Sequence, residues 1–435
     1  MLRSRVVSCA VLLFAACGPK AAPPTTEPTA TSSAALVPTA PPTVMAAPAV
    51  PKPLIAKGHH VDWWFAFKFN SATFSACDGG KTCPFGGTPQ PYPHGEGEQF
   101  AFASSESPQL AMKSTCIGET DQDPVGATFE QVWNGTSFYV LWNDQFYEDP
   151  KITGCGTSCG APSAHSKGMV AWSVSGRGFV MQVSTPSWPA AGNHAHPRST
   201  DGNTLGCVKD DNVMVSQHFF SLALTHEDLV KVLGALVNAS VVTDVSNEQI
   251  VHNGGPDDVQ ALVKTLGHHS TSTLVTKDVL STGATLISKP SALHVPPWQM
   301  VSATLGGTPL RAATWWEGRD PIPSTTATTP IECWDASLGH SGPVEIATTG
   351  TWQGKTIGLT GGLGKDFNHA KIGVSTDASN RVIFGDMNQE GSLAGKCTAS
   401  QNGRGGLFFV VENAQLHDSV ASLIHGQSGP IAKHP

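Results

Sequence analysis

The sequence predicts an α/β protein whose folded part consists of two similar halves, residues 57–240 and 241–435. A segment that begins at His165 recurs at His369, and an amphipathic helix is expected after each copy. Hydrophobic residues make up 40% of the 435 residues and charged residues 14%, with 45 Gly and 32 Pro. The chain is therefore too apolar to be disordered throughout and too rich in turn formers to be mostly helical.

The repeat aligns residues 165–184, HSKGMVAWSVSGRGFVMQVS, with residues 369–388, HAKIGVSTDASNRVIFGDMN, without a gap. Apolar runs on either side of Ser-Gly and Ser-Asn turns predict two strands in each copy. Five aligned positions are identical, namely His165/His369, Lys167/Lys371, Val170/Val374, Ser175/Ser379 and Arg177/Arg381. The halves are therefore expected to share a mixed β-sheet flanked by helices.

A helix is expected after each repeat. Thr225 is a suitable N-cap and Asp228 completes a capping box, ahead of an apolar stripe that ends near residue 236. Near the C-terminus, Asn413 can cap a helix for which Gly426 would provide the C′ stop. Strand pair and helix thus occur twice, which supports a pseudo-twofold arrangement.

Residues 1–17 predict a lipoprotein signal peptide. Arg3 and Arg5 precede an apolar stretch, and Ala-Ala-Cys17 resembles a lipobox in which Cys17 becomes the acylated N-terminus. Residues 18–56 are rich in Pro, Ala and Thr and are expected to form a disordered tether. We therefore expect an exported lipoprotein, periplasmic or at the cell surface, or a secreted protein if Cys17 is not lipidated.

The remaining eight cysteines favour a disulfide framework, since an even number is typical of exported chains. The short spacings Cys155-x3-Cys159 and Cys77-x5-Cys83 leave a metal site as a less favoured alternative. No metal or other cofactor is predicted.

The charge balance excludes a constitutively basic nucleic-acid coat. The chain has 26 basic and 34 acidic residues, which gives a formal charge of −8 at neutral pH. The 17 histidines make this charge strongly dependent on pH.

The two His-x-Lys motifs carry the chemistry. Strand alternation places His165 and Lys167 on one face, and likewise His369 and Lys371. If the pseudo-twofold brings both pairs to one seam, one imidazole can attack a phosphorus atom and the other can protonate the leaving oxygen. The lysines would hold the anionic oxygens, so the arrangement suits phosphodiester cleavage without a metal ion.

The doubled motif, with Gly-x-x-Asn after the second copy, resembles the phospholipase D superfamily, and within it the chain resembles deoxyribonuclease II. The similar segments run in the family's order from about residue 57 to 430. They are VDWWFAFKF (61–69), LWNDQ (141–145), AHSKGMV (164–170), STPSWP (184–189), NTLGCV (203–208), HAK (369–371) and GDMNQ (385–389).

The resemblance implies a pseudo-twofold phospholipase D-like fold and a metal-independent acid endodeoxyribonuclease that leaves 3′-phosphate and 5′-hydroxyl ends. His165 would be the nucleophile and His369 the acid, with Lys167 and Lys371 beside them. The expected partners are DNA and, through the lipid anchor, a membrane. No protein partner is predicted, and a homodimer stays open.

The resemblance also implies a set of supporting residues. Those expected to contact the phosphate or support the site are Asn388, Asp386, Ser184, Asn143, Asp144 and Asp62. Asp62 would either orient a histidine or bond backbone near the start of its strand. A disulfide between Cys333 and Cys397 is implied as well. The family partner of Cys207 has no direct equivalent, and Cys77 or Cys116 would replace it.

Two other functions compete with this interpretation. A phospholipase D-like phosphodiesterase acting on lipid or another phosphodiester would share the His-x-Lys pairs, but lipid would need an apolar groove. A non-catalytic surface-binding lipoprotein would leave the paired motifs without a role.

Overall fold

The computed structural model describes residues 49–77, 82–90, 97–318 and 320–433, and residues 48–435 form one compact unit. The predicted signal peptide with Cys17, and most of the predicted tether, lie outside the described residues. The end of that tether differs from the prediction. Leu54 is buried, and its N–H donates to Thr128 Oγ1 at 2.9 Å. The folded body therefore begins before residue 57, because Pro51, Pro53 and Leu54 are covered by it.

The first sheet has the strand order β10-β6-β7-β8-β9-β3-β4-β5, and each neighbouring pair is antiparallel. In chain order its strands are β3 (Trp63–Lys68), β4 (Phe100–Ser104), β5 (Ala111–Lys113), β6 (Phe138–Asn143), β7 (Lys167–Trp172), β8 (Gly178–Val183), β9 (Gln217–Leu224) and β10 (Val251–His252). The short edge strand β10 pairs with β6 although it follows residue 240.

The second sheet has the order β11-β12-β19-β18-β17-β13-β14 and is mixed, since β13 and β14 are parallel. Its strands are β11 (Thr276–Val279), β12 (Thr285–Lys289), β13 (Leu310–Ala313), β14 (Val344–Ile346), β17 (Ile372–Ser375), β18 (Arg381–Gly385) and β19 (Gly406–Glu412). Two hairpins stand apart, β1 (Leu54–Ala56) with β2 (His59–His60) and β15 (Thr349–Trp352) with β16 (Lys355–Gly358). The run β7-β8-β9-β3 of the first sheet corresponds to β17-β18-β19-β12 of the second, which confirms the predicted fold class of two α/β halves. The prediction of a mixed sheet in each half is wrong for the first half, because all of its strand pairs are antiparallel.

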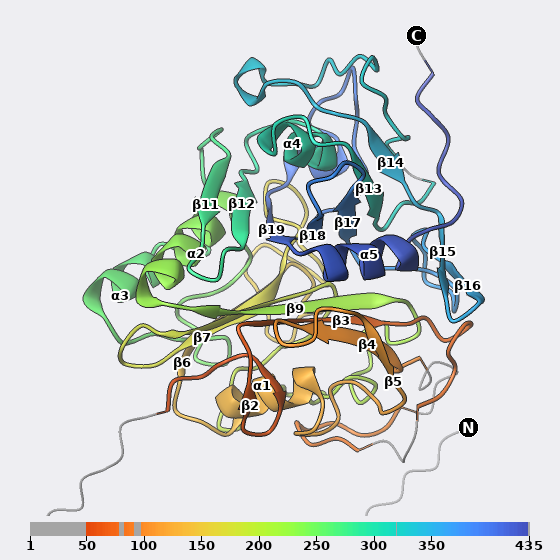
Figure 1. Cartoon of the computed structure of the whole chain (residues 1–435). Coiled ribbons are helices and arrows are strands. Elements are labelled where there is room, and N and C mark those ends of the chain that lie inside the picture. The colour runs from red at the N-terminus through yellow and green to blue at the C-terminus, as the bar shows by residue number, and fades with distance from the viewer. Residues whose placement is uncertain (1–48, 78–81, 91–96, 319, 434–435) are drawn as a thin grey trace, which may run out of the picture. The chain divides into compact units, whose positions relative to one another are not determined.

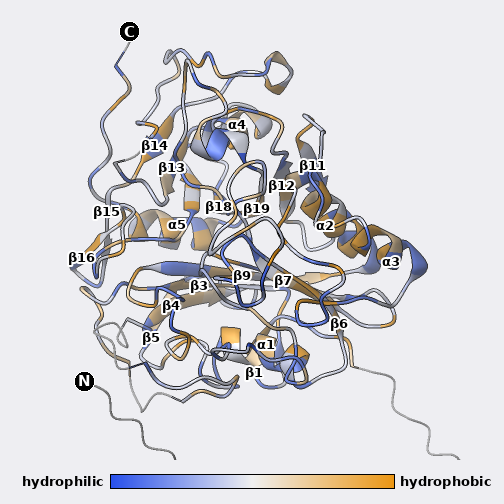
Figure 2. Cartoon of the chain, turned by 180° about the vertical axis from the view of Figure 1, so that it is seen from behind, coloured by the Kyte–Doolittle hydropathy of each residue, from blue (hydrophilic) through white to orange (hydrophobic). Residues whose placement is uncertain are grey.

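The helices alternate with the sheets (Figure 1). They are α1 (Pro124–Trp133), α2 (His226–Ala239), α3 (Asp257–Val263), α4 (Pro297–Thr304) and α5 (Ala414–Leu423), with 3₁₀ turns η1 (Ala336–Leu338) and η2 (Ser400–Gly403). Helix α2 contacts strands of both sheets, and α1 and α4 lie on the outer sides of the first and second sheet. Figure 2 shows hydrophobic and hydrophilic residues on both α2 and α3, as expected for helices with one buried face. No helix among the described residues is long and apolar enough to cross a membrane.

The two predicted helix starts are confirmed. Thr225 and Asp228 form the capping box of α2, and the Asn413 side chain accepts the Leu416 N–H at 3.0 Å. The predicted stop at Gly426 is wrong, because α5 ends at Leu423 and no left-handed residue follows it directly. Gly426 instead approaches the 349 backbone, where an added Cβ would lie 2.5 Å from the carbonyl oxygen.

An aromatic cluster joins the two sheets. Phe220 of β9 stacks on Phe384 of β18 with ring centroids 4.4 Å apart, and Phe65 and Phe409 complete the group. These rings are buried in a core cluster that draws on both sheets. The aromatic layer therefore fixes one sheet against the other.

The alignment of the repeats without a gap holds only up to the turn. Gly168 pairs with Gln182 in the first hairpin, whereas its equivalent Ile372 pairs with Phe384 in the second. The second turn is thus two residues shorter. Ser184 consequently corresponds to Asp386 and not to Asn388, and the identities at 175/379 and 177/381 are not structural equivalents.

Four disulfides link the described cysteines, Cys77–Cys116, Cys83–Cys207, Cys155–Cys159 and Cys333–Cys397. The last is the pair that the resemblance implied. The partner proposed for Cys207 is wrong, because the segment of Cys83 lies against it: the Asn203 N–H donates to Phe85 O at 2.9 Å. Four disulfides favour an oxidising, exported compartment.

Candidate active site

The strand topology brings both His-x-Lys motifs to one end of the two sheets. His165 lies just before β7 and His369 just before β17. The His165 N–H donates to Gly405 O at 2.9 Å, and the His369 N–H donates to Ser216 O at 2.8 Å. Each histidine is thus bonded through its backbone to the opposite half of the protein.

The His165 ring has a defined orientation. Its Nδ1 lies 2.8 Å from the backbone oxygen of Asp386, which can only accept, so Nδ1 carries the proton and Nε2 keeps its lone pair. Burial lowers the pKa of His165 well below its usual value, Asp144 opposes this, and Lys167 adds to it. A neutral imidazole with a free Nε2 is the form that can attack an electrophile.

The His369 ring lies in a different environment. It is 6% exposed, and the Trp315 ring packs edge-on against it with centroids 4.3 Å apart. Its Nε2 is buried and has no hydrogen-bond partner among the described residues. Burial, followed by the charges of Lys371, Lys167 and His165, lowers the pKa of His369 well below its usual value. The unpartnered nitrogen is free for a substrate.

Lys167 belongs to a buried ionic triad. Its Nζ donates to Asp144 Oδ1 at 2.6 Å, while Arg404 Nη2 donates to the other carboxylate oxygen at 2.9 Å. Burial would raise the pKa of Asp144, but Lys167, His165 and Arg404 hold it well below its usual range. The triad therefore stays ionised and fixes the Lys167 ammonium in the site.

Lys371 has no such carboxylate partner among the described residues. Burial and the charge of Lys167 lower the pKa of Lys371 to about 7, although Asp144 and Asp386 raise it. Its backbone N–H donates to His218 Nδ1 at 3.1 Å. His218 is fully buried, and burial and Lys371 lower its pKa to about 3, so it remains neutral and holds the motif in place.

Asp386 connects the two halves at the site. Its Oδ2 accepts from Ser166 Oγ at 2.6 Å and from the Leu407 N–H at 2.9 Å. Burial raises the pKa of Asp386 to about 7, against the hydrogen bonds that lower it. Asn388 donates to Glu390 Oε2 at 3.2 Å, and its own buried oxygen has no partner in the part of the chain that the structure describes. Burial likewise raises the pKa of Glu390 to about 7.

The three other predicted supporting residues bond elsewhere, although Asn143 is the ladder partner of Lys167. Asn143 Nδ2 donates to Trp188 O at 3.2 Å and so supports a neighbouring loop, while Ser184 Oγ donates to Gln217 Oε1 at 2.8 Å. Asp62 is exposed at the start of β3, the opposite end from the site, and its carbonyl accepts the Ala223 N–H. This bond is made by the backbone of Asp62, so both expected roles of its carboxylate stay predictions.

Sequence reasoning missed His218, Trp315 and Arg404. Trp315 corresponds to Asp144 in the other half. Asn143 lies opposite Lys167, and the register of Ala313 with Ile372 places residue 314 opposite Lys371. Asp144 and Trp315 are the residues that follow these two positions. Arg404 precedes β19 and is 260 residues from Asp144 in sequence. No spacing pattern marks these residues, although the strand register would have identified Trp315.

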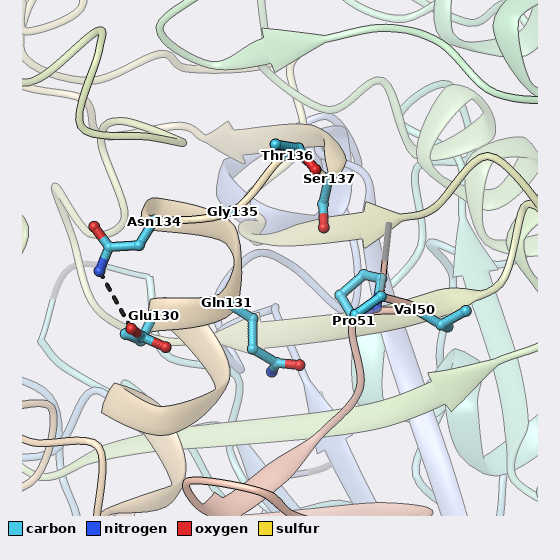
Figure 3. Close-up of a pocket in the computed structure, with 9 residues that line it drawn as sticks. Val50, Pro51, Glu130, Gln131, Asn134, Gly135, Thr136 and Ser137 are labelled. Atoms are coloured by element: carbon cyan, nitrogen blue, oxygen red, sulfur yellow. Dashed lines mark hydrogen bonds between the residues drawn. The ribbon is translucent and has the colours of Figure 1, made fainter. Parts of the chain in front are cut away.

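One surface hollow lies away from these residues. It has a volume of about 370 Å³. Residues at the C-terminal end of α1 and residues 49–51, at the start of the folded body, line it (Figure 3). Gln131 Nε2 donates to Lys52 O at 2.8 Å there, and Asn134 lies 3.4 Å from Glu130. None of the residues predicted for the site lines this hollow.

The arrangement combines an imidazole whose Nε2 keeps its lone pair, a second imidazole whose Nε2 has no partner among the described residues, and two lysine side chains. Groups of these types can cleave a phosphodiester. The family model for deoxyribonuclease II matches residues 53–429. No curated protein matches the chain significantly. The match covers most of the chain and confirms the resemblance drawn from the motifs. The chain therefore belongs to the deoxyribonuclease II family and is a phosphodiester hydrolase that acts on DNA.

Proposed function

We propose that the protein is a metal-independent acid endodeoxyribonuclease in which His165 is the nucleophile and His369 the general acid. The observation that carries the proposal is the bond from His165 Nδ1 to Asp386 O, which leaves Nε2 available for attack. The surroundings of His369 support its role as the acid. Its buried Nε2 has no partner among the described residues, so the leaving oxygen of a substrate can bond to it.

The reaction proceeds in two balanced steps. His165 Nε2 bonds to phosphorus as the bond to the 5′-oxygen breaks, and His369 gives its proton to that oxygen. His369 then takes a proton from water, whose oxygen bonds to phosphorus while the bond to His165 breaks. The products are a 3′-phosphate and a 5′-hydroxyl. Lys167 and Lys371 hold the anionic oxygens, and Asn388 contacts the phosphate.

The ionisable groups around Lys371 support an acidic preference. Lys371, Asp386 and Glu390 each have a pKa of about 7. As the pH falls through 7, Lys371 gains a positive charge and the two carboxylates lose negative charge. The site therefore becomes more favourable to a phosphodiester anion below neutral pH, where an acid form of His369 is also easier to populate.

Plasmid cleavage should persist in excess EDTA, because two histidines and two lysines supply the nucleophile, the acid and the charge stabilisation. Agarose gels measure the cutting, and end-group analysis should find 3′-phosphate and 5′-hydroxyl termini. Loss of cutting in EDTA with recovery in magnesium or zinc would overturn the proposal.

DNA binding should strengthen from pH 7.5 to 5.5 and weaken with salt. Without residues 1–16 the chain has 24 basic and 34 acidic residues, a formal charge of −10 that full protonation of all 17 histidines would change to +7. The buried histidines of the site contribute little, but many others are exposed, namely His59, His60, His194, His196, His252, His268, His269, His294, His340 and His425. Fluorescence anisotropy with the His165→Ala variant measures the affinity, and equal affinity at both pH values would count against this.

We also propose that Cys17 is acylated and anchors the exported enzyme to a membrane. The lipobox-like Ala-Ala-Cys17 sequence supports the anchor, and the four disulfides support the exported location.

A further inference from the structure

Lys68, the last residue of β3, has its ammonium group buried among backbone carbonyl oxygens. The side chain is fully buried. Its Nζ donates to Val215 O at 2.6 Å, to Gly97 O at 2.9 Å and to Phe69 O at 3.4 Å, and it also contacts Val213 O. The lysine therefore holds the extended segment that leads into β9.

Lys289, the last residue of β12, has the same surroundings in the second half. Its fully buried Nζ donates to Arg404 O at 2.8 Å, to Asn402 O at 2.9 Å, to Leu293 O at 2.6 Å and to Pro290 O at 3.3 Å. This lysine holds the segment that leads into β19.

The two lysines are pseudo-twofold equivalents. Lys68 pairs with Gln217, the first residue of β9, and Lys289 pairs with Gly406, the first residue of β19. In both halves the ammonium binds the carbonyls two and four residues before that partner, and the carbonyl of the residue after the lysine. Among the described residues, three acceptors of each lysine therefore correspond, which makes the arrangement a built feature of each half.

The carbonyl directly after the second one that each lysine binds accepts the backbone N–H of a histidine of the other half. Ser216 O, which follows Val215 O, accepts the His369 N–H, and Gly405 O, which follows Arg404 O, accepts the His165 N–H. Successive carbonyls of an extended segment point to opposite sides, so one segment bonds a lysine on one side and a histidine backbone on the other. At Gly405 the packing is tight, since an added Cβ would lie 1.9 Å from Ala239 O.

Retaining these two charges needs a reason, because burying an ammonium group costs free energy that an apolar side chain would not. Three N–H donors on one atom can draw several carbonyls towards a single point, and an apolar side chain cannot. The benefit is a fixed position for the segments that carry Ser216 and Gly405.

We propose that Lys68 and Lys289 are positioning residues that act across the pseudo-twofold, Lys68 on His369 through Ser216 and Lys289 on His165 through Gly405. The inference rests on the proposed function for the roles of the two histidines. It predicts that each lysine affects the catalytic step carried out in the opposite half.

The test compares two substrates that differ in the leaving group. Cleavage of DNA needs an acid to protonate the leaving alkoxide, whereas bis(p-nitrophenyl) phosphate releases p-nitrophenolate without one. Lys68→Met should lower kcat on DNA about 100-fold, the size of effect that misplacing a catalytic group produces. It should change the rate of the first p-nitrophenolate release from the ester, which reports attack by His165 alone, less than about threefold. Lys289→Met should lower kcat on DNA and the rate of that first release to a similar extent. The two patterns should match those of His369→Ala and His165→Ala, measured alongside.

Lys277→Met provides the matched control, since Lys277 also donates to a backbone carbonyl, Thr304 O at 3.1 Å, but lies on the edge strand β11 away from the site. It should leave both activities unchanged. Lys68→Gln and Lys289→Gln keep two donors and carry the test if the methionine variants do not fold. Circular dichroism identifies the folded variants.

Both lysine variants could instead lose activity equally on the two substrates, in proportion to their loss of thermal stability. That result would show that the lysines have a purely structural role. The reversed pattern would show that each lysine serves the histidine of its own half. Either result overturns the inference. Full activity of His165→Ala or His369→Ala would instead refute the proposed function, and the two failures are therefore distinguishable.

Discussion

Asp144→Asn should destabilise the protein by about 3–5 kcal/mol, because it leaves two buried cations without their counter-charge. The Asp144 side chain is 2% exposed and bonds both the Lys167 ammonium, 3% exposed, and the Arg404 guanidinium. Asparagine keeps the shape and one acceptor oxygen but not the charge. Chemical denaturation at pH 6, followed by tryptophan fluorescence, measures the change in the free energy of unfolding.

The pH dependence of this loss follows from the two pKa shifts. Asp144 has a folded pKa below its unfolded value near ~4, so its contribution is present above that value and is lost only in stronger acid. In the variant, Lys167 should resemble Lys371, whose pKa is about 7. A lysine with a lowered folded pKa loses stability as the pH falls from ~10 to that folded value. The deficit should therefore be larger at pH 6 than at pH 9.

Asp62→Asn is the matched control, since it makes the same substitution at an exposed carboxylate that the sequence also associated with the site. Its effect should stay within about 0.5 kcal/mol. A loss at Asp144 no larger than that at Asp62 would mean that the triad contributes nothing to stability.

Local pattern predicted those elements whose cause is local. The capping box at Thr225, the cap at Asn413 and the two hairpins depend on neighbouring residues and appear as expected. The length of a turn is less visible, so the alignment without a gap matched Ser184 with Asn388. The strand register instead places Asp386 at that position, where its carbonyl orients His165.

Contacts between the halves could not be predicted from one sequence. Arg404 reaches Asp144, and Ser166 reaches Asp386, across more than 200 positions. Such pairs follow from how the Phe220–Phe384 stack sets one sheet against the other, and not from the residues nearby. The internal repeat identified the two His-x-Lys motifs, whereas the groups that position them, such as His218, became visible only in three dimensions.

His369→Ala should retain the ability to form a covalent phosphohistidine while losing about 10²–10⁴-fold of its activity on DNA. His165 keeps its Nδ1 bond to Asp386 in this variant, so its Nε2 can still attack a substrate whose leaving group needs no acid. With bis(p-nitrophenyl) phosphate, acid-quenched mass spectrometry should find the phosphoryl adduct on His165. His165→Ala should lose activity on both substrates and form no adduct.

The structure makes this outcome asymmetric although the repeats are similar. His165 has a backbone acceptor that fixes its tautomer, whereas His369 packs against Trp315 and has an unpartnered Nε2 in the described part of the chain. Two coupled imidazoles, one neutral and one protonated, should also give a bell-shaped pH profile in the wild type. An adduct on His369 in His165→Ala would reverse the two roles. No adduct in either variant would favour direct attack by water, with His165 acting as a base through the same free nitrogen.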